Sequence, residues 1–272
     1  MENWADWIGL TKSQHSLLDP IVAQKMQVTI NQEATLKTGE PLPPAWHWLY
    51  FSELTKVQDA GPDGHTKLGI NVPDFGLPRR MWAGGRITWH RDLILGQVAT
   101  RDSKIFDIQE KTGRSGKLVF LTLQHEITQN NQICISEVQN IVYREFSKQT
   151  QKVELTAAPT DYDFNQSWNV DEVTLFRYSA LTFNSHRIHY DVDYTRNVEG
   201  YPGLVVHGPL LATLLLDLAK SNNLTVHEFS YKAVSPITLP AQFMASAKKS
   251  ETGTDLWISN ESGFVAMEAK LT

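Results

Sequence analysis

A short apolar segment near the C-terminus places the strongest limit on how this chain can fold. Residues 210–219 are leucine, alanine and threonine except for Asp217. Gly208-Pro209 precede the segment, and proline is favoured in the first turn of a helix because the N–H that it lacks would be unpaired there. A helix that is apolar on nearly every face is buried on every side. The rest of the chain must therefore enclose this helix.

A second helix is predicted in the first half of the chain, over residues 45–54 after Pro43-Pro44. Each predicted helix is followed by runs that alternate apolar and polar residues between short polar or glycine-containing turns. This pattern is typical of an antiparallel meander. We predict strands at residues 86–90, 97–101, 105–110, 117–127 and 133–144, and again at 226–234, 242–248, 255–259 and 264–271.

The repeated order of one helix and then several strands divides the chain into two halves. The 272 residues fit two domains of ~100–200 residues each, and the segment from Ser147 to Asn169 between them is polar. We predict an N-terminal domain over residues 1–150, a linker over 151–170 and a C-terminal domain over 171–272. A curved sheet wrapped around one helix satisfies each half, so the predicted fold class is α+β.

Charge and cysteine content exclude several classes of function. Lys plus Arg total 25 and Asp plus Glu total 30, so the net charge of −5 gives no general attraction to nucleic acid or to an anionic membrane. Cys134 is the only cysteine, which excludes an internal disulfide, and its apolar neighbours predict a buried core residue. No stretch approaches the ~18 apolar residues of a membrane span, and the N-terminus has no secretory or transit pattern. We expect a cytoplasmic protein.

The densest group of reactive side chains lies between Tyr178 and Asp191, shortly before the C-terminal helix. Two of the nine histidines, His186 and His189, fall within it. A solvated loop with two surface histidines would explain the pattern. A metal site that also includes His207 is another alternative, but no motif such as H-E-x-x-H supports it, and we predict no metal.

The segment that leads into the C-terminal helix gives a third interpretation. A helix N-terminus carries unpaired N–H groups and the positive end of the helix dipole, which suits a developing oxyanion. Gly208 would let a substrate carbonyl approach the backbone there. A histidine on the adjacent loop would then serve as general acid or base near neutral pH. These features together describe enolate chemistry on a thioester.

The stretch 178–218 resembles the (R)-specific enoyl-CoA hydratase motif of the MaoC-like, hot-dog-fold family. That motif reads aspartate, any residue, asparagine, proline, an aliphatic residue and histidine, and V-H-G follows at the central helix. Asn184 stands at the position of the aspartate, His186 at that of the asparagine and Arg187 at that of the proline. His189 and Gly208 match the family pattern.

The segments Leu77 to Arg86 and Gly113 to Phe120 extend this resemblance into the first half. They are similar to the branch that contains 3-methylfumaryl-CoA (mesaconyl-CoA) and itaconyl-CoA hydratases and the mitochondrial-type hydroxyacyl-thioester dehydratases. The resemblance implies a double hot dog, in which the C-terminal half carries the catalytic motif and the N-terminal half shapes the substrate pocket. It implies an acyl-CoA thioester as substrate and no separate cofactor, since coenzyme A belongs to the substrate. A homodimer is optional, because hot-dog domains pair through their sheets and two halves satisfy this within one chain.

The resemblance also implies roles for individual residues in the addition of water to an enoyl thioester, or in the reverse reaction. Gly208 N–H would bind the thioester oxygen and His189 would carry the proton. Asn184 does not titrate near neutrality, and its amide would hold the water instead. We predict a branched dicarboxylic C5 acyl group as the substrate.

The predicted substrate-binding residues are Arg79, Arg80, His186 and His207. The two arginines suit a carboxylate or phosphate, or else form structural ion pairs. His207 is alternatively a capping or packing residue. A 3-hydroxyacyl-thioester dehydratase of fatty acid metabolism, a thioesterase and a non-catalytic acyl-CoA-binding module remain as alternative functions.

Overall fold

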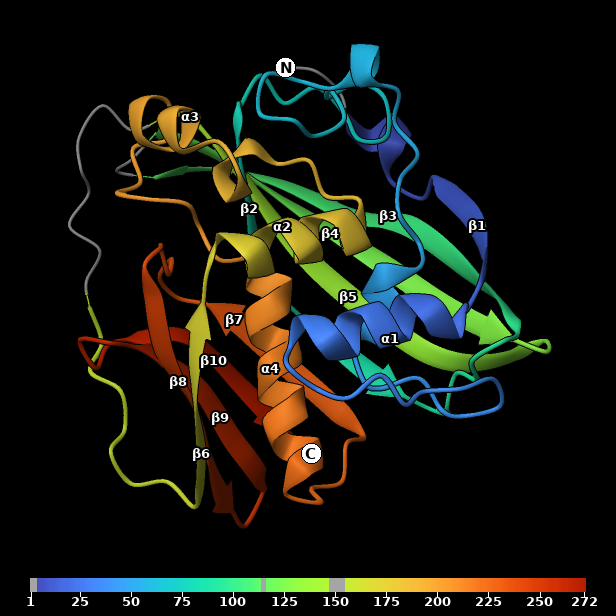
Figure 1. Cartoon of the computed structure of the whole chain (residues 1–272). Coiled ribbons are helices and arrows are strands. Elements are labelled where there is room, and N and C mark those ends of the chain that lie inside the picture. The colour runs from blue at the N-terminus through green and yellow to red at the C-terminus, as the bar shows by residue number, and fades with distance from the viewer. Residues whose placement is uncertain (1–3, 114–115, 147–154) are drawn as a thin grey trace.

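A computed structural model of the chain describes residues 4–113, 116–146 and 155–272. The strands of these residues form one antiparallel sheet in the order β1-β3-β4-β5-β2-β7-β10-β9-β8-β6. Figure 1 shows α1 in front of the N-terminal strands and α4 in front of the C-terminal strands, on the same side of the sheet. The predicted α+β fold class is confirmed.

The N-terminal half contains η1 (Trp4–Trp7), β1 (Thr11–Leu17), α1 (Pro20–Thr29), η2 (Trp46–Leu49), η3 (Val57–Asp59), β2 (Arg79–Trp89), β3 (Val98–Gly113), β4 (Gly116–Gln129) and β5 (Gln132–Arg144). The C-terminal half contains β6 (Phe164–Val170), α2 (Glu172–Thr182), η4 (Arg187–His189), α3 (Val192–Asn197), α4 (Gly208–Ser221), β7 (Glu228–Ala233), β8 (Ala241–Ser250), β9 (Gly253–Asn260) and β10 (Val265–Leu271). The α labels mark α-helices and the η labels 3-10 turns.

The two halves repeat one strand order and meet at the pair β2 and β7. Outward from β2 the sheet runs β5, β4, β3 and β1, and outward from β7 it runs β10, β9, β8 and β6. At the junction Gly84 pairs with Lys232, and Gly85 pairs with Tyr231. A Cβ on Gly84 would lie 2.5 Å from the Tyr231 carbonyl oxygen, and one on Gly85 would lie 2.5 Å from the Tyr231 hydroxyl. The glycine pair therefore allows the two halves to join.

The predicted C-terminal helix is confirmed as α4. Its leucines and alanines are at most 3% exposed, and Thr213 is 2% exposed. The helix packs against β6, β8, β9 and β10, so the sheet encloses it as its sequence required. Cys134 is also buried as predicted.

The predicted N-terminal helix over residues 45–54 is wrong. Only η2 forms there, and Ala45 before it has a left-handed backbone with φ 66°. The aromatic side chains of this segment are poor helix formers and pack into the core without a regular helix. The helix of this half is α1, where Asp19 caps the first turn and Pro20 occupies its first position.

The strand predictions miss both edges of the sheet. Strands β1 and β6 have mostly polar sequences, because an edge strand with one exposed face needs few apolar side chains. β6 occupies Phe164–Val170, so the predicted linker over 151–170 is too long, and its residues 151–154 lie outside the described chain. The predicted strands 97–101 and 105–110 are one strand, β3, with a bulge between Ile105 and Asp107. Within the described residues, no helix is long and apolar enough to cross a membrane.

Candidate active site

The segment with the predicted motif turns sharply between α2 and α3, beside the N-terminus of α4. The left-handed backbone of Phe183 ends α2 with φ 52°. The turn η4 then carries His189, and Asp191 begins α3 by accepting a hydrogen bond from Tyr194 N–H. The alternative of a solvated loop is excluded for the two histidines, since His186 is 6% exposed and His189 is 7% exposed.

His189 is held in one orientation by the backbone. Its Nδ1 lies 2.7 Å from the Val205 carbonyl oxygen, which can only accept, so Nδ1 carries the proton and Nε2 has a free lone pair. Burial is the main cause that lowers the pKa of His189 well below 6.5, followed by repulsion from His207 and His186. The imidazole is therefore neutral near pH 7 and is ready to accept a proton at Nε2.

The imidazole ring of His207 packs against that of His189. The two rings stack with centroids 3.5 Å apart and planes 17° apart. His207 Nε2 lies 2.8 Å from Ser179 Oγ, and its side chain makes no capping bond to α4 although it occupies the N-cap position. Burial, and then His186, lower the pKa of His207 to about 3. His207 therefore packs against His189, and its role in binding a substrate stays a prediction.

The first turn of α4 leaves backbone donors free beside these rings. Among the described residues, no backbone or side-chain oxygen accepts a hydrogen bond from Gly208 N–H. The indole of Trp82 lies directly against this glycine, because a Cβ on Gly208 would lie 2.7 Å from Trp82 Cε3. Trp82 belongs to β2, so the N-terminal half supplies one wall of the site. A carbonyl oxygen placed here would meet a free N–H and the positive end of the helix dipole.

Asn184 is held at the start of the same loop. Its Oδ1 accepts a hydrogen bond from His186 N–H at 3.0 Å, and its own N–H donates to the Ser179 carbonyl at 2.9 Å. Within the described chain its Nδ2 has no partner, and the carbonyl oxygen keeps a second lone pair. The amide can therefore still contact a water molecule.

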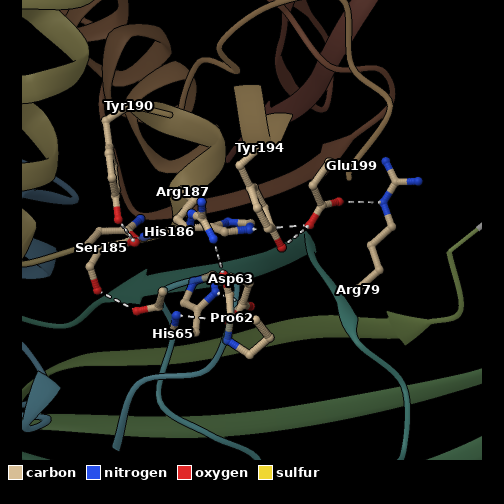
Figure 2. A network of polar contacts seen from close by, with 12 residues as sticks. Pro62, Asp63, His65, Arg79, Ser185, His186, Arg187, Tyr190, Tyr194 and Glu199 are labelled. Carbon is tan, nitrogen blue, oxygen red and sulfur yellow. Dashed lines mark hydrogen bonds and ion pairs between the residues drawn. The ribbon is translucent and has the colours of Figure 1, made fainter. Parts of the chain in front are cut away.

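His186 faces the N-terminal half across the loop (Figure 2). Its ring centroid lies 4.2 Å from that of His65 and 5.5 Å from that of His189. Its Nε2 lies 3.9 Å from Oε1 of the buried Glu199. His186 consequently connects the loop between α2 and α3 with a polar network that the sequence did not indicate.

The two predicted arginines differ in their surroundings. Arg79 Nε lies 3.3 Å from Glu199 Oε2, and its guanidinium covers the ring of Tyr201 at 4.8 Å. Arg79 thus forms the structural ion pair that the sequence left open. Arg80 has no ion pair with an acidic side chain of the described residues, although its charge acts on His65.

A metal site has weak support in this geometry. His189 Nδ1 is used by Val205, and His207 stacks on His189 instead of converging with it on one point. In the described part of the chain, Asp63, His65 and His186 bring ligand atoms within 4.8 Å of one another. However, His65 already binds Asp63, and the positive charge of Arg80 acts on this group.

Comparisons with known proteins identify the family. Residues 45–239 match the family model described as hydroxyacyl-thioester dehydratase type 2. The chain is 38% identical over 98% of its length to a mesaconyl-C(4)-CoA hydratase of Chloroflexus aurantiacus, of which it covers 96%. This chain belongs to the hydroxyacyl-thioester dehydratase type 2 family. It is therefore an enzyme of the hydratase and dehydratase class.

Solved structures confirm the double hot-dog fold of this dehydratase-family chain. A MaoC-like dehydratase of Phytophthora capsici aligns with a TM-score of 0.74 at 14% identity, over 99% of this chain and 98% of that one. A Mycobacterium tuberculosis protein described as having a double hot-dog fold aligns with a TM-score of 0.61 at 11% identity, over 97% and 96% of the two chains. At such identities the likeness concerns the fold alone.

Proposed function

We propose that this hydro-lyase adds water to a branched dicarboxylic C5 enoyl-CoA, such as mesaconyl-CoA or itaconyl-CoA, or catalyses the reverse reaction. One observation carries the proposal. Nε2 of His189 keeps its lone pair beside the first turn of α4, where no oxygen of the described residues accepts a hydrogen bond from Gly208 N–H. The 38% identity with the Chloroflexus mesaconyl-C(4)-CoA hydratase supports the substrate class.

The proposed reaction needs one proton carrier. The thioester oxygen accepts a hydrogen bond from Gly208 N–H, where the dipole of α4 stabilises the charge that develops on it. His189 Nε2 removes a proton from water while the water oxygen bonds to the β-carbon. The double-bond electrons move to the thioester as an enolate, and the proton on His189 then passes to the α-carbon. The products are a 3-hydroxyacyl thioester and regenerated neutral His189.

Asn184 is proposed to hold the attacking water. It does not exchange a proton near neutral pH, so it cannot replace an aspartate as acid or base. The bond from His186 N–H fixes the direction of its amide. Its free Nδ2 and second lone pair then orient water for His189.

An aromatic cluster of Trp48, Trp82 and Tyr231 favours a short acyl group. Trp82 stacks on Tyr231 with centroids 4.6 Å apart, and Trp48 meets Trp82 edge to face at 5.8 Å. Trp48 Nε1 donates to the buried Glu137 at 2.8 Å. Burial alone would raise the pKa of Glu137, but the hydrogen bond and charge of His47 lower it to about 2, so the acceptor is a carboxylate. We therefore expect the cluster to exclude a long acyl chain from the side of Gly208 that faces the N-terminal half.

Replacing Trp82 by alanine should open this wall. We expect kcat/KM for 2-octenoyl-CoA to rise at least about tenfold relative to that for crotonyl-CoA, because methylene groups accepted by an apolar pocket contribute ~1–3 kcal/mol each. Trp89→Ala, on the same strand, is the matched control. An unchanged ratio in the Trp82 variant would show that the cluster does not limit chain length.

The substrate proposal is tested by offering itaconyl-, mesaconyl- and crotonyl-CoA to the wild-type protein. Loss of the enoyl-thioester absorbance measures hydration, and thiol release is followed in parallel. We expect absorbance to fall without thiol release, and fastest for a dicarboxylic substrate. Thiol release would indicate a thioesterase, and no change in either signal would indicate a binding module. A preference for crotonyl-CoA would favour the fatty-acid dehydratase alternative.

A further inference from the structure

A loop of the N-terminal half is fixed against the catalytic loop. The backbone carbonyl of Asp63 accepts a hydrogen bond from Arg187 N–H at 2.8 Å, and the backbone carbonyl of Gly64 accepts one from Ser185 Oγ at 2.5 Å (Figure 2). Gly64 has φ 92°, and a Cβ there would lie 1.9 Å from the Ser185 carbonyl oxygen. Only glycine permits this approach. The loop is therefore built to bring its next residue, His65, to the site.

His65 is oriented by its own loop and directed toward the catalytic histidines. Its Nδ1 lies 3.0 Å from Asp63 Oδ2, while its ring lies 4.2 Å from that of His186. Among the described residues, Nε2 of His65 has no hydrogen-bond partner, and the side chain is 22% exposed. Burial, and then the charge of Arg80, lower the pKa of His65 to about 3. His65 is thus a neutral imidazole with an unpaired nitrogen, and the charge of Arg80 acts on it.

Arg80 faces the same space from β2. It precedes Trp82 by two residues, and alternate residues of a strand share one face of the sheet. Because Trp82 covers Gly208, this is the face beside the N-terminus of α4. Arg80 is half-buried and has no acidic partner in the described chain. A partly desolvated cation of this kind is stabilised by an anion.

We propose that Arg80 and His65 form an anion subsite that binds the second carboxylate of a dicarboxylic acyl thioester. This inference rests on the proposed function. In 3-methylfumaryl-CoA that carboxylate is bonded to the carbon that receives the hydroxyl group, so its binding site must lie near His189. The contacts from His65 to His186 and from His186 to His189 meet this requirement.

The two residues have complementary roles in this subsite. The guanidinium of Arg80 supplies charge and paired donors that match a carboxylate. A bound carboxylate also offsets the charge of Arg80, which disfavours protonation of His65. His65 can then take up a proton and donate from Nε2, with Asp63 stabilising the cation. Binding of the dicarboxylic group is consequently expected to take up a proton from solution.

The test compares substrates that differ in the carboxylate. For Arg80→Gln we expect the ratio of kcat/KM for mesaconyl-CoA to that for crotonyl-CoA to fall about 100-fold, and for His65→Gln about tenfold, as for lost charged hydrogen bonds. Arg86→Gln on the same strand and His90→Gln, both at exposed positions, are the matched controls and should leave the ratio unchanged. If both substrates lose activity in parallel, or if neither does, the subsite is overturned.

A binding measurement separates this proposal from the reaction. Succinyl-CoA and butyryl-CoA have no double bond to hydrate, and they differ by a carboxylate. Calorimetry should show tighter binding of succinyl-CoA to the wild type, proton uptake that depends on His65, and loss of the preference in Arg80→Gln. Arg80→Lys keeps the charge and should retain part of the preference if the glutamine variant does not fold. A wild type that hydrates nothing but prefers succinyl-CoA would overturn the proposed function and leave the subsite standing, whereas equal binding would overturn the subsite.

Discussion

Replacement of His189 by alanine should reduce kcat/KM for the preferred enoyl-CoA by about 10²–10⁴-fold. The variant loses the Nε2 lone pair that accepts the proton of water, and no other neutral imidazole of the described site is held by a backbone carbonyl beside Gly208. Steady-state hydration, followed by the enoyl-thioester absorbance, measures the loss. His15→Ala on the exposed face of β1 is the matched control. Near-wild-type turnover in the His189 variant would remove it from the mechanism.

The pH profile provides a second readout for His189. The neutral imidazole is the active form, and burial lowers its pKa well below 6.5. Activity is present above the lowered pKa and is lost only as the pH falls through it. We therefore expect kcat/KM of the wild type for crotonyl-CoA, which has no second carboxylate, to stay constant from pH 8 down to pH 6.5, because this parameter reports the free enzyme. An acid limb centred at or above pH 6.5 would contradict the assignment.

The Gly208→Ala variant should lose about 10²–10³-fold in kcat, the range found when one oxyanion donor is removed. The new methyl group would lie 2.7 Å from Trp82 Cε3, so either the indole or the first turn of α4 must move. Either shift displaces the free N–H from the thioester oxygen. Overpacking should also lower the stability by about 1–3 kcal/mol, which a denaturant titration would detect.

A double variant distinguishes the clash from other causes. Trp82→Ala removes the atoms that the new methyl group would meet. If the clash is responsible, Gly208→Ala combined with Trp82→Ala should recover part of the kcat lost by Gly208→Ala alone, since neighbouring substitutions are not additive. Losses that simply multiply would show that Trp82 does not set the position of this turn.

Local patterns were sufficient for most of the fold. The apolar surface of α4 and the alternation in β4, β5, the end of β2 and the C-terminal strands β7 to β10 can be read from neighbouring residues, and the structure contains these elements. The first part of β2 and the helices α1, α2 and α3 were not predicted. The errors have a common cause. The aromatic run after Ala45 and the polar edge strands β1 and β6 owe their conformation to what packs beside them. A window of sequence does not contain those partners.

The candidate site divides in the same way. Asn184, His186 and His189 lie on one loop, and Gly208 begins the next long helix, so a spacing pattern could find them. Nothing in the sequence indicated Asp63, Gly64 or His65, since Gly64 and Ser185 are 121 positions apart. The sequence also could not show which arginine lacks an acidic partner among the described residues, because Glu199, the partner of Arg79, lies in the other half of the chain.

The sequence by itself determined that a helix apolar on every face must be enclosed, and that a histidine loop precedes its glycine start. These are properties of residues close together in the chain. Only the tertiary structure decided what surrounds that histidine. The pairing of β2 with β7 brings Trp82 and Arg80 to the N-terminus of α4, and the loop at Gly64 docks His65 against His186. The physical reason is that these contacts form only when the two halves share one sheet.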